Sequence, residues 1–162
     1  MLDIFKAECR RFLPWAGVYA LAHLGVLVFL ARVVDLAQQP LEVYYVFGAV
    51  YALSGLLLGL YQMGGYRRPN HWLNLLHRPL APRRIALALL GAGALLLALA
   101  VLLPLLATAA WQALASPRVL DLRHGLLCLA AFDYALIGYL GGVAAILLPR
   151  RAAAVPLVFL AL

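Results

Sequence analysis

Two ionisable side chains, His23 and Asp133, lie well inside long apolar stretches of the sequence. An ionised Asp at the centre of a membrane helix costs about 2.5–3.5 kcal/mol on insertion scales, so Asp133 needs a partner. Counted at about 1.5 Å per residue from the ends of their stretches, the two residues differ in depth by roughly 5 Å. We therefore predict a contact between His23 and Asp133 facing the interior of a helix bundle. The alternative is a protonated Asp133 bonded to a tyrosine such as Tyr51 or to a backbone carbonyl.

The four histidines raise a second possibility, a haem-binding membrane anchor. Haem needs two axial ligands at matching depth on facing helices, whereas only His23 lies well inside an apolar stretch. The chain has no HExxH, GxSxG or GxxxxGK[ST] motif, which argues against a metalloprotease, a serine hydrolase and a nucleotide-binding loop. We expect no enzymatic activity, metal or cofactor in this chain.

The composition is that of a membrane protein. Of the 162 residues, 67% are hydrophobic and 12% are charged, whereas soluble domains average about 45–50% and about 25%. A helix needs roughly 20 apolar residues to cross a bilayer. The sequence therefore predicts an all-α, polytopic transmembrane helix bundle in a single domain, with spans at about 14–34, 41–63, 85–111 and 125–148 and a partial fifth span from 152. We expect the native chain to continue beyond Leu162.

The basic residues predict how the bundle is oriented. Most of the net charge of +7 lies in short segments beside the spans, which indicates membrane orientation and gives no reason to expect a nucleic acid partner. The segments with an excess of basic residues precede the first span, join the second span to the third, and precede the fifth. We therefore expect a cytoplasmic N-terminus. The high Ala, Leu and Arg content with a single lysine is typical of a bacterial protein, which places the chain in the inner membrane.

Small residues indicate how the spans pack. In lipid, helices associate through close backbone approach at small residues. Two GxxxG spacings occur, Gly55 with Gly59 and Gly138 with Gly142, and they predict packing within the chain or, alternatively, a contact between two copies. Pro104 removes one backbone hydrogen bond from the third span and should kink it.

Two amphipathic segments are predicted not to cross the membrane. Residues 2–12 have apolar side chains at three- and four-residue steps and predict a short helix in the interfacial plane. Asn70 is a good N-cap and Pro79 forbids continuation, so residues 70–78 predict a helix of about two turns. This helix is too short to be stable alone. Its apolar face, which includes Trp72, must lie on the membrane surface or in a groove of a soluble protein.

The order of these elements resembles the membrane (permease) subunits of ABC transporters of the ABC-2 type exporter class. Residues 72–80 (WLNLLHRPL), followed by Pro82-Arg83-Arg84, are similar to the coupling region of that family. The resemblance implies an elbow helix at residues 2–12, a cytoplasmic coupling helix at about 70–78, a separate ABC ATPase subunit as partner, and a second permease subunit. The residues expected to contact the ATPase are Asn70, His71, Trp72, Leu73, Leu75, Leu76, His77, Arg78 and Arg83.

A membrane scaffold or assembly subunit without transport activity is the competing interpretation, because a helix bundle by itself does not specify a function. A neighbouring gene for an ATPase with a Walker A motif would favour the permease, and its absence would favour the scaffold.

Overall fold

The computed structural model describes residues 1–34, 39–67, 77, 80–115 and 121–148, and every regular element within them is a helix. In chain order the elements are α1 (Leu2–Val33), α2 (Leu41–Gly64), the 3₁₀ turn η1 (Gly65–Arg67), α4 (Pro82–Leu97), the π-helical turn η2 (Ala98–Leu102), α5 (Leu103–Ala115) and α6 (Leu122–Leu147).

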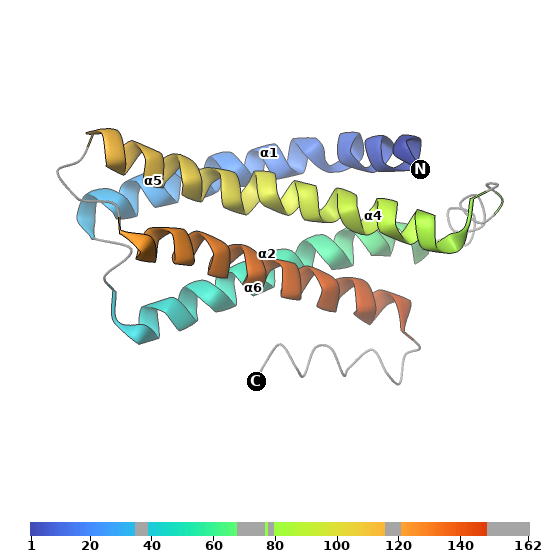
Figure 1. Ribbon diagram of the computed structural model, residues 1–162. Helices are drawn as coiled ribbons and strands as arrows, with labels where there is room; N and C mark the ends of the chain where they lie inside the picture. Colours follow the sequence, from blue (N-terminus) through green and yellow to red (C-terminus); the bar gives the residue numbers. More distant parts are fainter. Residues whose placement is uncertain (35–38, 68–76, 78–79, 116–120, 149–162) are drawn as a thin grey trace.

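Four long rods form the bundle (Figure 1), because α4, η2 and α5 follow one another without a break. Within the described residues, each rod is long and apolar enough to cross a membrane, as a multi-pass membrane protein requires. The chain runs up and down, so the start of α1, the end of α2, the start of α4 and the end of α6 lie together at one end of the bundle. We name this the basic end.

The N-terminal segment differs from the prediction of a separate elbow helix. Residues 2–12 are helical, but they continue directly into the first span as a single helix that includes Pro14. The buried positions of this part of α1 follow a four-residue step through Ile4, Glu8, Phe12 and Ala16. That spacing puts them on one face, so this part of the helix packs into the bundle instead of lying in the interfacial plane.

Helix α2 packs chiefly against α6, and the glycines of both GxxxG spacings form the contact. A Cβ added to Gly55 would collide with the carbonyl oxygen of Ala135, and one added to Gly138 would collide with the carbonyl oxygen of Ala52. Only glycine permits two backbones to approach this closely. The structure thus uses these glycines within one chain, in a seam made of Gly55, Gly59, Gly138 and Gly142.

Helix α1 packs chiefly against the rod α4–η2–α5, which gives the bundle a second helix pair. The π-helical turn ends at Leu102, two residues before Pro104, and a proline cannot donate the usual backbone hydrogen bond. At the place where the sequence predicts a kink, the helix thus contains a widened turn at residues 98–102.

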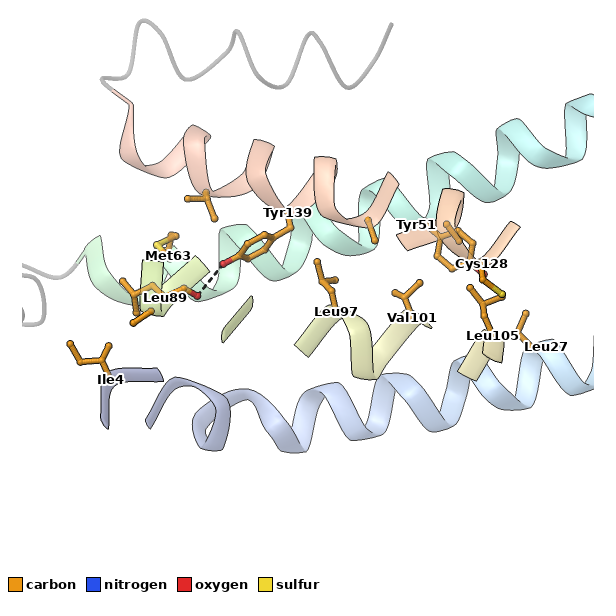
Figure 2. Packing of buried hydrophobic residues seen from close by; sticks show 14 of the residues in the cluster. Ile4, Leu27, Tyr51, Met63, Leu89, Leu97, Val101, Leu105, Cys128 and Tyr139 are labelled. Atoms are coloured by element: carbon orange, nitrogen blue, oxygen red, sulfur yellow. Dashed lines mark hydrogen bonds between the residues drawn. The ribbon is translucent and has the colours of Figure 1, made fainter. Parts of the chain in front are cut away.

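The two helix pairs meet through large side chains in the centre and through polar side chains near the basic end. Figure 2 shows part of this core, with Leu97 and Val101 of the third rod next to side chains of the other helices. The backbones of α1 and α2 stay apart, and a mostly apolar groove of about 570 Å³ lies between them with its floor on α4 and η2. The bundle consists of two closely packed pairs with a looser boundary.

Candidate functional site

A buried polar cluster crosses the boundary between the helix pairs near the basic end. Its members are Glu8 of α1, Gln62 of α2, Tyr66 of η1 and Tyr139 of α6. Glu8 is 4% exposed, and Gln62 and Tyr139 are fully buried. Buried polar groups of this kind are stable only when they are hydrogen-bonded to one another.

Gln62 is the centre of the cluster. Its amide nitrogen donates to Glu8 Oε2 at 3.2 Å and to the backbone carbonyl of Leu89 at 3.1 Å. Its amide oxygen accepts a hydrogen bond of 2.8 Å from the Tyr139 hydroxyl, which also lies 3.4 Å from the Leu89 carbonyl (Figure 2). Gly93 makes room for the Tyr139 phenol, because a Cβ there would collide with it. One side chain thus joins α1, α2, α4 and α6.

Tyr66 connects the cluster to the segment between α2 and α4. The Tyr66 hydroxyl donates to Glu8 Oε1, and the Arg11 guanidinium lies 3.9 Å from the same oxygen and 5.9 Å from the centre of the Tyr66 ring. Burial, and then the hydrogen bond to Glu8, raises the pKa of the Tyr66 phenol, so it remains a neutral donor at physiological pH. A displacement of η1 therefore acts directly on the only carboxylate of the cluster.

A second set of polar contacts lies deeper in the bundle, around His23. His23 Nδ1 is 3.1 Å from the carbonyl oxygen of Ala100, and His23 Nε2 is 3.0 Å from the Tyr51 hydroxyl. In an α-helix, the Ala100 carbonyl would accept from the residue four positions later, which is Pro104 and has no N–H. His23 thus supplies the donor that the proline cannot, and this assigns the proton to Nδ1 and makes Nε2 the acceptor from Tyr51.

The predicted contact between His23 and Asp133 is wrong. Both ring nitrogens of His23 are engaged by other groups, and Asp133 lies on the exposed face of α6. Similar depth in the membrane does not determine the direction in which a side chain leaves its helix. His23 points toward Ala100 and Tyr51, whereas Asp133 points out of the bundle. Tyr51, the alternative partner considered for Asp133, is bonded to His23.

The arrangement around His23 also bears on the haem alternative. An axial ligand must offer a nitrogen lone pair to the iron, but here Nε2 accepts from Tyr51 and Nδ1 faces a carbonyl. Haem binding would require the Tyr51 bond to break. Across the part of the chain that the structure describes, no group of three or more His, Cys, Asp or Glu side chains could hold a metal ion.

Most of the residues predicted to contact an ATPase lie outside the described residues. These are Asn70, His71, Trp72, Leu73, Leu75, Leu76 and Arg78. Of the two that are described, His77 is exposed and Arg83 is exposed in the first turn of α4. Arg83 therefore lies at the basic end with its side chain exposed.

Sequence reasoning missed the polar cluster. The signal was present in Glu8, which follows Ile4 and precedes Phe12 at four-residue steps and so shares their face of the helix. A carboxylate on a buried face requires partners from other helices. Gln62 was a further indication, since it is an amide near the end of an otherwise apolar span.

Comparison with models of protein families, with curated proteins and with solved structures finds no match for this chain.

Proposed function

We propose that this chain is a permease subunit of an ATP-driven, ABC-type exporter in the bacterial inner membrane. It works with a separate ATPase subunit and a second permease subunit. The observation that supports the proposal most strongly is the bond between Tyr66 and Glu8, because it ties the start of the segment between α2 and α4 to a cluster that joins both helix pairs. The resemblance of residues 72–84 to an exporter coupling region provides independent support.

The charge distribution supports a cytoplasmic position for the basic end. Excess Lys and Arg beside membrane spans mark the cytoplasmic side. At the basic end, the described basic side chains outnumber the acidic ones: Lys6, Arg10, Arg11, Arg83 and Arg84 against Asp3 and Glu8. At the other end they balance, with Arg32 and Arg123 against Glu42 and Asp121. An ATPase in the cytoplasm would thus meet the segment between α2 and α4.

The coupling mechanism follows from the position of Tyr66. ATP-driven closure of the ATPase subunits would displace the segment that they hold, and η1 would move with it. Tyr66 would then pull on Glu8, whose other oxygen is bonded to Gln62. Since Gln62 also contacts α4 and α6, the displacement would reach the boundary between the two helix pairs. Movement at that boundary is what would open a path between two permease subunits.

Co-purification with the candidate ATPase tests the proposal. Trp72, Leu75 and Leu76 form the predicted apolar face, and truncating a buried aromatic anchor typically costs about 2 kcal/mol or more. Trp72→Ala and Leu76→Ala should therefore release the ATPase. Arg83→Ala is the matched control, because a rim charge mainly changes the association rate. Tyr66→Phe should retain the ATPase but reduce the response of hydrolysis to the membrane subunit.

Retention of the ATPase by both Trp72→Ala and Leu76→Ala, with unchanged hydrolysis, would overturn the proposal. The membrane scaffold would then be the better interpretation. In that case the segment between α2 and α4 would lie on the headgroups, with Trp72 as an interfacial residue.

A further inference from the structure

One exposed face of α6 is apolar except for a single carboxyl group at its centre. We name this face the α6 stripe. Its residues recur at three- and four-residue steps and are all exposed in the isolated chain: Leu122, Leu126, Leu129, Asp133, Ile137 and Leu140. Asp133 is the twelfth of the 26 residues of α6, so it lies near the middle of the span.

A carboxyl group in this position requires a cover other than lipid. Acidic side chains within membrane spans almost always face protein or water and have a polar partner, because hydrocarbon offers none. Within the described residues, Asp133 makes no hydrogen bond or ion pair, and His23, the nearest candidate by depth, is already engaged. The missing partner must therefore be a group that lies outside the described residues.

Tyr134, the residue next to Asp133, provides the matching donor. Its ring packs over Gly48, where a Cβ would lie 3.2 Å from the ring, and the residue remains 45% exposed. Its phenol has no hydrogen-bond partner among the residues that the structure describes. Neighbouring residues on a helix do not face each other, so Tyr134 does not satisfy Asp133 of its own chain. It does lie at almost the same depth, about 1.5 Å along the axis.

We propose that a second copy of this chain covers the α6 stripe, with Asp133 of each copy accepting a hydrogen bond from the Tyr134 phenol of the other. A two-fold axis along the membrane normal keeps each residue of the second copy at the same depth, and it makes the two contacts reciprocal. The glycine seam is not available for this purpose, because α2 and α6 of one chain already occupy it. The proposal identifies the contact face of the paired permease subunits, and so it rests on the proposed function.

Disulfide cross-linking in native membranes tests whether the α6 stripe is the contact face between two copies. In a background with Cys9→Ser and Cys128→Ala, single cysteines at Leu129 and Ile137, one turn on either side of Asp133, should form homodimers on oxidation. A cysteine at Leu53, which is exposed on α2, is the matched control and should stay monomeric. Cross-linking at Leu53 but not on α6, or cross-linking of α6 only to a different protein, would overturn the proposal.

A double-mutant cycle tests the hydrogen bond itself. Asp133→Leu should weaken dimerisation by about tenfold, since two hydrogen bonds between membrane helices are lost per dimer. Tyr134→Phe keeps the ring over Gly48 and should weaken dimerisation by a similar factor, and combining it with Asp133→Leu should cause no further loss. Asp133→Asn, which still accepts a hydrogen bond, should retain most of the affinity. Additive losses, or wild-type dimerisation of Asp133→Leu, would refute the reciprocal bond.

Binding of the ATPase distinguishes a failure of this inference from a failure of the proposed function. Asp133 lies far along the chain from residues 70–78, so Asp133→Leu should leave the ATPase bound while the dimer weakens. If the chain dimerises through the α6 stripe but binds no ATPase, the contact face is supported and the proposed transport function is wrong. An ATPase that binds a chain whose α6 stripe does not cross-link would remove only the inference.

Discussion

Replacing Gly142 by Ala should separate α2 from α6 and destabilise the bundle. The added Cβ would lie 2.5 Å from the Leu56 carbonyl oxygen and 2.9 Å from the Leu60 nitrogen. Ordinary contacts begin at 3.4 Å, so the helices would have to part by about 0.9 Å, the difference between 2.5 and 3.4 Å. Both neighbours are backbone atoms and cannot rotate away. Overpacking of this kind typically costs about 1–3 kcal/mol.

Unfolding in mixed micelles with increasing SDS, followed by circular dichroism, measures this free energy. Gly17→Ala is the matched control, because a Cβ on Gly17, also inside a helix, would meet nothing within 4 Å. Its unfolding free energy should stay unchanged or rise by up to about 1 kcal/mol, the difference in helix propensity. Gly138→Ala should cost more than Gly142→Ala, since its Cβ would lie still closer to a carbonyl oxygen.

Equal unfolding free energies for Gly142→Ala and Gly17→Ala would show that α2 and α6 do not pack closely at the glycine seam. A loss that appears only at high protein concentration would also refute it, because the glycines would then act between two copies and not within one chain.

Other positions give equally specific expectations. His23→Phe should lower the unfolding free energy by about 1–3 kcal/mol by leaving a buried carbonyl unpaired. The loss should shrink in a Pro104→Ala background, which restores the helical donor, and equal losses in both backgrounds would contradict the pairing. Glu8→Leu should destabilise the bundle more than Glu8→Gln does, because glutamine still accepts from its buried neighbours; SDS unfolding measures the order of the two. A cysteine at Gln38 should react with an impermeant reagent in intact cells and one at Asn74 should not; the opposite result would reverse the orientation.

The sequence predicted four membrane-length helices and their approximate limits, because hydropathy and length determine them. The predicted partial fifth span from residue 152 lies outside the described residues. It also indicated the four glycines as packing residues, since small residues at a four-residue step have few other uses in lipid. Which helices would meet at these glycines was left open between one chain and two. That choice depends on how each helix is rotated, and the apolar pattern of a membrane span does not specify rotation.

The same limitation explains the error at Asp133. Depth in the membrane can be counted along the chain, and it placed His23 and Asp133 at similar levels. The direction of a side chain around its helix is decided by tertiary packing, here by the glycine seam, which turns the face with Ala135 and Gly138 toward α2 and leaves Asp133 outside. Glu8 is missed because residues 2–12 are predicted as a separate helix in the interfacial plane. Its four-residue spacing from Phe12 is visible in the sequence, but it indicates a buried position only if this segment continues into the bundle, as it does in α1.

A distance measurement between spin labels tests whether ATP moves the two helix pairs relative to each other. Labels at Val18 of α1 and Leu57 of α2, both exposed, report on different pairs, and labels at Leu53 of α2 and Ile137 of α6 report on one pair. With the ATPase bound, ATP should change the distance between Val18 and Leu57 and leave the distance within the α2–α6 pair unchanged. If the distance between Val18 and Leu57 is the same with and without ATP, the helix pairs do not move and the proposed coupling mechanism is wrong.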